Sequence, residues 1–236
     1  MTETSATPAL AGRDLSRVFR TPSGDVHAVS EVSLEVQPGE LLVVRGPSGS
    51  GKTTLLNLLG GLDRPTSGTV WLGTEELTAM DEPELLDVRR RRLSYVFQSF
   101  GLIPVLSAAE NVEVPLRLLR TDPDERERRV AEALDVVGLS GHANQRPYEL
   151  SGGQQQRVGI ARALVSEPEI LLADEPTGQL DSATAATIMD LLQTLVHDRG
   201  LAAVVSTHDP LLMGRADRVL ELHDGRAQRR GRHSAA

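Results

Sequence analysis

One stretch of the sequence constrains the fold more than any other, the glycine-rich loop at residues 46–53. It reads Gly-Pro-Ser-Gly-Ser-Gly-Lys-Thr and matches the pattern G-x-x-x-x-G-K-S/T. A short apolar run at residues 41–44 precedes the loop, and residues 53–59 have the pattern of a helix. A buried strand, a glycine loop and a helix in this order form a cradle for phosphate groups. The sequence therefore predicts an α/β fold built around a phosphate-binding loop.

Each residue type in this loop suits the phosphates of a nucleotide. Glycines let the backbone curl so that successive N–H groups face an anion, and the start of the next helix adds partial positive charge. Lys52 supplies a charge for the β- and γ-phosphates, and the Thr53 hydroxyl is a ligand suited to Mg²⁺. The expected phosphate-binding residues are Gly46, Pro47, Ser48, Gly49, Ser50, Gly51, Lys52, Thr53 and Thr54.

Composition narrows the class of nucleotide-binding protein. Lys52 is the single lysine of the 236-residue chain, so the guanine-reading motif N-K-x-D of a typical GTPase is excluded. A net charge of −8 argues against non-specific binding of nucleic acid. The absence of cysteine excludes a disulfide scaffold and Cys-based metal sites. No apolar run reaches the roughly 18 residues of a membrane span, and the N-terminus does not resemble a signal peptide, so we expect an intracellular protein.

The rest of the chain indicates strands that alternate with helices. Residues 15–44 have a largely alternating pattern interrupted by turns. Apolar runs at residues 169–173, 202–206 and 219–222 indicate buried strands, and residues 183–196 form an amphipathic helical pattern. This alternation predicts a parallel α/β sheet.

Domain organisation follows from the same patterns. We expect one domain over residues 11–225, with mostly helical sequence from 83 to 163 and a helical subdomain at about 88–163 inserted into the sheet. Residues 1–10 are small and polar, and residues 226–236 are basic and poor in apolar side chains, so both are expected to be flexible tails.

Two carboxylates end one of the buried strands. Asp174 and Glu175 follow the apolar residues 170–173. If this strand ends beside the phosphate loop, Asp174 lies near Mg²⁺ and Glu175 lies near an attacking water. Neighbouring acids at a buried position are costly unless they share a cation or a proton. The alternative is that Asp-Glu-Pro caps a helix.

A second glycine turn comes shortly before that strand. Residues 150–157 read Leu-Ser-Gly-Gly-Gln-Gln-Gln-Arg. A Ser-Gly-Gly turn that opens a helix is itself an anion-binding arrangement of N–H groups. Two anion-binding helix starts in one chain suggest a composite site.

With these motifs in this order, the chain resembles the nucleotide-binding subunit of ABC transporters over nearly its full length. The resemblance rests on the phosphate loop, on residues 150–154 as the signature motif, and on residues 170–175 as the carboxylate strand. Three further segments match the D-loop, the switch-histidine loop and the Q-loop of that family: residues 178–181, 206–209 and 96–98.

The resemblance implies a P-loop NTPase fold of the ABC type, with an antiparallel β subdomain and an inserted helical subdomain. It also implies a head-to-tail homodimer that binds and hydrolyses Mg-ATP. The phosphate loop of one subunit would bind the ATP, and the signature motif of the other would cap it. The implied signature residues are Ser151, Gly152, Gly153 and Gln154.

Individual roles also follow from the resemblance. Glu175 would polarise the attacking water, and His208 would contact the γ-phosphate, although a histidine after a buried strand is also compatible with a core position. Gln98 would sense Mg²⁺ and water, Asp181 would couple the two sites, and Phe19 would stack on adenine unless it is a core residue. The implied metal ligands are Thr53, Gln98 and Asp174.

One subgroup of the family is resembled in residues 58–65 and in residues 98–104 followed by 109–112. It contains the lipoprotein-releasing ATPase, the ATPase domain of the macrolide exporter, and the cell-division ATPase that pairs with an FtsX-type permease. This implies an FtsX- or MacB-like membrane permease as partner, no nucleic acid partner, and a location on the cytoplasmic face of the membrane. A stand-alone P-loop ATPase or kinase is the alternative, and the transported substrate is not indicated. The apolar residues of 100–106 either dock the permease or pack the helical subdomain.

Overall fold

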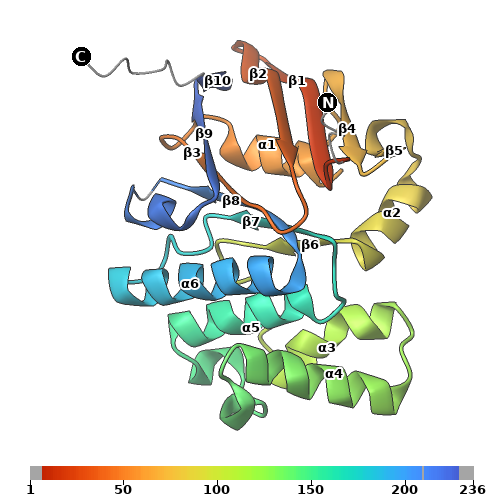
Figure 1. The fold of residues 1–236 in the computed structure, drawn as a ribbon, viewed down its shortest axis with the longest axis vertical. Coiled ribbons are helices and arrows are strands. Elements are labelled where there is room, and N and C mark those ends of the chain that lie inside the picture. The colour runs from red at the N-terminus through yellow and green to blue at the C-terminus, as the bar shows by residue number, and fades with distance from the viewer. Residues whose placement is uncertain (1–6, 209, 229–236) are drawn as a thin grey trace, which may run out of the picture.

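The computed structural model describes residues 7–208 and 210–228, which form two sheets and a group of helices (Figure 1). A four-stranded antiparallel sheet has the order β2-β1-β4-β5. Its strands are β1 (Leu10–Thr21), β2 (Gly24–Val36), β4 (Ser67–Leu72) and β5 (Glu75–Glu76). The predicted antiparallel β subdomain is confirmed.

A six-stranded sheet of order β10-β9-β3-β8-β7-β6 forms the centre of the molecule. Its strands are β3 (Leu41–Arg45), β6 (Leu93–Val96), β7 (Ile170–Asp174), β8 (Ala202–Thr207), β9 (Arg218–His223) and β10 (Arg226–Gln228). The strands from β9 to β6 run parallel, which confirms the predicted parallel sheet.

The central strands are buried on both faces, as their continuous apolar runs predict. Successive side chains point to opposite faces. Leu42 and Val44 of β3 therefore join one core, together with α1 (Lys52–Leu59) and the antiparallel sheet. Leu41 and Val43 join a second core on the other face, together with the remaining large helices. The two cores fix the register of the strands that carry the site.

The helices of the second core form layers beneath the sheet (Figure 1). They are α3 (Ala108–Leu118), α4 (Pro123–Val136), α5 (Gly152–Leu164) and α6 (Ser182–Arg199). Helix α6 and helix α5 lie nearer the sheet, and α3 packs against both α4 and α5. Helix α2 (Glu82–Arg91) and four short 3₁₀ turns complete the described chain: Leu77–Ala79, Ser140–His142, Pro147–Glu149 and Pro210–Arg215.

The expectation that residues 83–163 are mostly helical is wrong at one place. Residues 93–96 form strand β6, which pairs in parallel with β7 and belongs to the central sheet. The segment is only four residues long and directly follows a run of arginines. Its strand conformation depends on backbone pairing with a segment more than 70 residues away, from Leu93 to Ile170. The inserted helices therefore begin after this strand.

Both expected tails are shorter than the sequence suggested. Leu10 is fully buried and pairs with Val36 and Leu72, so it belongs to β1. Residues 226–228 form β10 against β9, through a turn at Asp224 and Gly225 that have positive φ angles of 46° and 73°. An Asp-Gly pair is a strong hairpin signal. The remaining tail residues, 1–6 and 229–236, lie outside the described residues.

Candidate active site

The phosphate loop leaves the end of β3 and closes at the start of α1. Gly51, the residue before α1, has a φ of 100°, and Gly49 has a φ of 79°; both are left-handed conformations that favour glycine. Gly51 has no side chain that could cap the helix, and the first turn of α1 holds no acidic residue. The N–H groups at the start of α1 are therefore suited to an anion.

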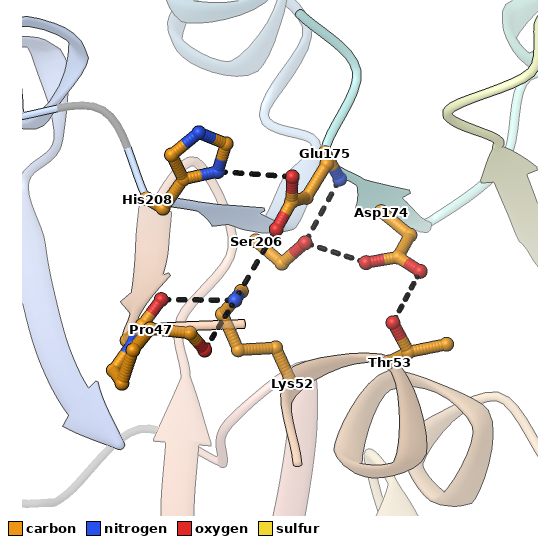
Figure 2. Close-up of polar contacts among 8 residues, drawn as sticks. Pro47, Lys52, Thr53, Asp174, Glu175, Ser206 and His208 are labelled. Carbon is orange, nitrogen blue, oxygen red and sulfur yellow. Dashed lines mark hydrogen bonds and ion pairs between the residues drawn. The ribbon is translucent and has the colours of Figure 1, made fainter. Parts of the chain in front are cut away.

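Lys52 lies inside this loop with only 5% of its surface exposed. Its ammonium group donates hydrogen bonds to the carbonyl oxygens of Gly46 (2.9 Å) and Pro47 (3.1 Å). The ammonium nitrogen also lies 3.2 Å from Oε1 of Glu175 (Figure 2). These three partners match the three N–H donors of a lysine, so the buried charge is fully compensated.

Parallel pairing of β7 with β8 brings Asp174 beside Ser206. The Ser206 hydroxyl donates to Oδ1 of Asp174 (2.6 Å), and the backbone N–H of Glu175 donates to Ser206 Oγ (2.8 Å). The Thr53 hydroxyl donates to Oδ2 of Asp174 (2.7 Å) (Figure 2). Both oxygens of the Asp174 carboxylate are therefore oriented by hydroxyl groups. The predicted proximity of Thr53 and Asp174 is thus observed.

Glu175 lies between Lys52 and His208. Its Oε2 lies 3.0 Å from Nδ1 of His208, while Oε1 faces Lys52. A carboxylate only accepts hydrogen bonds, so this contact assigns a proton to Nδ1 of His208. The backbone of Glu175 has a φ of 43°, a left-handed conformation that costs a non-glycine residue about 1–2 kcal/mol. The side chain of His208 is 58% exposed, which excludes the core-histidine interpretation.

Of these residues, Lys52, Thr53 and Glu175 line a pocket of about 510 Å³. Gln98 also lines the pocket, and its side chain lies close to that of Glu175. Gln98 Nε2 and Glu175 Oε2 both lie near Gly178, at 3.2 and 3.4 Å from the position that a Cβ of this glycine would occupy. The pocket is bounded by β2, the phosphate loop, the Asp174–Glu175 turn and the β9–β10 turn. Its lining residues are Val26, His27, Ala28, Ser48, Gly49, Gly51, Lys52, Thr53, Thr54, Gln98, Glu175, Asp224 and Gly225.

The oxygen donors of the pocket fit Mg²⁺, a cation that prefers hydroxyl, carboxylate, phosphate and water ligands. Within residues 7–208 and 210–228, no three His, Asp or Glu side chains converge to hold a metal on their own. A site made of Thr53 and Asp174 is therefore incomplete without oxygens from a bound phosphate and from water. This is the usual form of a magnesium site in a nucleotide-binding protein.

Comparison with known proteins, like the geometry of the pocket, indicates a nucleotide-binding protein. Residues 29–178 match the family profile described as ABC transporter. The chain belongs to this family. It is an ATP-binding cassette, and an ATPase. The alternative was a stand-alone P-loop ATPase or kinase, and the family match decides against the kinase.

Similarity to individual relatives indicates the subgroup of the family that the cassette resembles. It is 46% identical over 216 residues to the lipoprotein-releasing system ATP-binding protein LolD of Pseudomonas fluorescens, covering 92% of this chain and 95% of that protein. It is 43% identical over 216 residues to the macrolide export ATP-binding/permease protein MacB of Salmonella typhimurium, covering 90% of this chain but only 33% of that longer protein. The predicted resemblance to the LolD and MacB subgroup is confirmed.

Solved structures have the same fold. The cassette MJ0796 of Methanocaldococcus jannaschii, solved as a dimer, is 42% identical to this chain with a TM-score of 0.86, covering 93% of this chain and 97% of that one. A dimeric structure of MJ0796 in a post-hydrolysis state, bound to ADP and Pi, gives the same TM-score of 0.86 with 41% identity, covering 93% and 97% of the two chains. The predicted ABC-type fold is confirmed.

The signature residues of the cassette are not part of the pocket. Ser151 caps α5 through a reciprocal pair of bonds: its N–H donates to Gln154 Oε1 (2.8 Å), and its Oγ accepts from Gln154 N–H (3.3 Å). Neither these two residues nor Gly152 and Gly153 are among the lining residues of the pocket in the same chain. The structure therefore brings together the phosphate loop, the carboxylates, Gln98 and His208, but not the signature.

Two other predicted residues have local roles that the sequence did not indicate. Asp181 caps α6, accepting hydrogen bonds from the N–H groups of Ala183 and Thr184 and from the Thr184 hydroxyl. These bonds, the Thr184 hydroxyl first, lower the pKa of Asp181. Phe19 is 37% exposed and lies under the guanidinium of Arg17, so it is not a core residue.

Sequence reasoning missed Ser206 as a site residue. It is fully buried, yet both of its hydrogen bonds reach the two carboxylate residues. Its position in a loop motif gave no sign of this, because the contact depends on the register between β7 and β8. Val26 and His27 on β2 and Asp224 at the β9–β10 turn were also missed as pocket residues, because only the folded chain brings these distant segments to the phosphate loop.

The two left-handed glycines of the loop give a paired prediction. A Cβ at Gly51 would lie 2.1 Å from the carbonyl oxygen of Ala28, whereas a Cβ at Gly49 would meet nothing within 4 Å. Both substitutions to alanine impose about 1–2 kcal/mol of backbone strain. Gly51→Ala is therefore expected to lower the free energy of unfolding clearly more than Gly49→Ala, measured by urea denaturation. Equal losses for the two variants would contradict this steric account.

Proposed function

We propose that this chain is the ATP-hydrolysing subunit of a membrane transporter, and that two copies bind Mg-ATP at two composite sites to drive a permease of the FtsX or MacB type. One observation carries the proposal. In a single chain the phosphate loop, Gln98 and Glu175 line one pocket, and Asp174 and His208 bond to Thr53 and Glu175 beside it, but the anion-binding start of α5 does not line this pocket. A second copy would supply it, as the dimeric structures of MJ0796 support.

The proposed phosphate site follows from the hydrogen-bond donors of the phosphate loop and of Lys52. The N–H groups of the phosphate loop and of the first turn of α1 donate to the β- and γ-phosphates, with the remaining loop residues Gly46, Pro47, Ser48, Ser50 and Thr54 shaping the turn. Two N–H donors of the Lys52 ammonium bond to carbonyl oxygens of its own loop, and the third faces the carboxylate of Glu175. The γ-phosphate takes that third donor, which frees one Glu175 oxygen for a water molecule.

Thr53, Asp174 and Gln98 are the residues proposed to hold Mg²⁺, which when bound neutralises charge on the phosphate oxygens. Asp174 keeps one oxygen on Ser206 and turns the other toward Thr53. Gln98 lies close to Glu175 at the edge of the pocket, so its amide is placed to hold the attacking water.

Glu175 is proposed as the general base. Its left-handed backbone and the bond from its N–H to Ser206 point the carboxylate into the pocket, away from the Asp174 side chain. His208, released from Glu175, donates to the γ-phosphate. A positioned general base typically contributes about 10²–10⁴-fold to the rate.

The base of the nucleotide is proposed to stack on Phe19. The residue pairs across the hairpin with Val26, which lines the pocket, so an aromatic ring stands at the rim of the nucleotide site. Arg17 covers one face of the ring, which leaves the other face for adenine.

The composite site is proposed to form when Ser151, Gly152, Gly153 and Gln154 of one copy contact the γ-phosphate held by the other. The start of α5 carries backbone N–H groups that suit an anion. Asp181 orders the start of α6, which packs against the signature: a Cβ at Gly153 would lie 2.5 Å from Thr184 Cγ2. Asp181 is thereby proposed to link the D-loop to the signature.

The decisive variant is Glu175→Gln, which keeps the size of the side chain but removes its charge. Hydrolysis is expected to fall by about 10²–10⁴-fold, while ATP binding persists and holds two copies together. Analytical ultracentrifugation should find monomers without nucleotide, dimers with Mg-ATP, and monomers with Mg-ADP. Adding Ser151→Arg, which fills the signature turn, should prevent the dimer. Hydrolysis at the wild-type rate would falsify the role of Glu175.

The permease is proposed to dock at an apolar groove of about 400 Å³ beside β6. The groove includes Leu62, Phe97 and Leu118, all exposed, and Phe97 directly precedes Gln98 of the nucleotide site. Exposed apolar side chains grouped in this way are typical of a protein interface. Among the residues expected to dock, Leu102 packs against the second core, whereas Val105 is 73% exposed. A cytoplasmic helix of the permease is the proposed occupant.

The names of two relatives support a membrane partner, and the cassette is proposed to lie at the cytoplasmic face of that partner. The MacB relative is described as an ATP-binding/permease protein, and LolD as part of a lipoprotein-releasing system. In the described part of this chain, no helix is long and apolar enough to cross a membrane. The names of these two relatives support a permease as the membrane-spanning partner of the cassette.

Single-cysteine variants test the docking groove, because the chain has no cysteine of its own. In a purified complex with a permease of the FtsX or MacB type, Leu118→Cys is expected to crosslink to a cysteine in a cytoplasmic permease helix. Val219→Cys is the matched control, since β9 lies toward the opposite edge of the central sheet from β6. Crosslinking of the control alone, or of neither variant in an active complex, would rule out this groove as the docking site.

A further inference from the structure

A strained turn lies two residues beyond Gln98. Phe100 and Gly101 both have a φ of 59°, in the left-handed region. Glycine adopts this conformation freely, but a bulky residue such as phenylalanine does so rarely. The surroundings of Phe100 must therefore hold it there.

Arg162, near the end of α5, binds this turn. Its Nη1 donates to the carbonyl oxygen of Gly101 (2.6 Å), and its Nη2 donates to the carbonyl oxygen of Phe100 (3.1 Å). The planar guanidinium thus grips two consecutive carbonyls, a geometry that a lysine cannot reproduce. These two hydrogen bonds join residues that lie more than 60 positions apart in the sequence.

The same turn touches α5 at two further places. The Cζ atom of Phe100 lies 3.7 Å from the position of a Cβ at Gly152, the first residue of α5 and part of the signature. The carbonyl oxygen of Phe100 lies 3.3 Å from the position of a Cβ at Gly159. Residues 152, 159 and 162 recur at helical spacing and share one face of α5. The turn therefore lies along this helix from the signature almost to its end.

We propose that the Phe100–Gly101 turn, gripped by Arg162, sets the position of the signature at the start of α5, so that Phe100 and Arg162 are positioning residues for the composite ATP site. This inference rests on the proposed function, in which Ser151–Gly153 contact the nucleotide bound by a second copy. Neither Phe100 nor Arg162 lines the pocket of its own chain. Their loss is expected to change assembly of the composite site and not the binding of ATP to a single chain.

The test uses the Glu175→Gln protein, in which the dimer accumulates. Phe100→Gly removes the ring but suits the left-handed backbone. We expect ATP to bind the variant monomer with unchanged affinity, while the dissociation constant of the Mg-ATP dimer rises by about tenfold. Val105→Gly is the matched control: it adds a glycine to the same loop at an exposed residue, and the dimer should be unaffected.

A second variant keeps the test decisive if Phe100→Gly fails to fold. Arg162→Lys retains the charge but not the double grip, so it should weaken the dimer in the same direction. In the double variant the two effects should be less than additive, because both act through one turn. If Glu175→Gln alone does not dimerise with Mg-ATP, the proposed function itself fails. If it dimerises and both variants match it, the positioning role is overturned.

Discussion

The ammonium group of Lys52 is the interaction on which the rest of the site depends. It is nearly buried, and a buried charge is tolerated only when it is fully paired. Two carbonyls of its own loop and the carboxylate of Glu175 supply that pairing. The loop must therefore be tightly curled, and β7 must end beside it. The glycines, the parallel register and the placement of Glu175 together pair the ammonium charge of Lys52. The phosphates of a bound nucleotide can pair this charge in place of Glu175.

The sequence predicted the parts of the structure that are encoded locally. The glycine pattern and the single lysine identified the phosphate loop, and continuous apolar runs identified β3, β7 and β8 as strands buried on both faces. Because the carboxyl ends of parallel strands meet at one edge of a sheet, the proximity of Asp174 to Thr53 also followed. The Ser-Gly-Gly turn at residues 151–153 was also identified locally, as an anion-binding helix start. The family resemblance then gave this turn its role as the signature and supplied Gln98 and His208, which no local pattern identifies.

What the sequence did not predict depends on contacts between distant segments. Strand β6 exists because β7 pairs with it, and Ser206 reaches Asp174 only through the register of β7 with β8. The left-handed backbone of Phe100 is held by Arg162, far along the chain. Arg92, at the end of α2, forms ion pairs with Glu75 and with Glu169, both distant in the sequence. Each of these features is set by tertiary structure, which overrides local preference.

The central claim is that each ATP site combines the phosphate loop of one copy with the signature of the other, and a mixing experiment tests it most directly. Lys52→Ala and Ser151→Arg proteins should each be inactive as ATPases on their own. In a mixed dimer, one ATP site combines the substituted phosphate loop of the Lys52→Ala copy with the substituted signature of the Ser151→Arg copy. The other site combines the intact phosphate loop of the Ser151→Arg copy with the intact signature of the Lys52→Ala copy. Mixing the two inactive proteins should therefore restore ATP hydrolysis. A mixture that stays as inactive as its components, although mixed dimers form, would contradict the composite site.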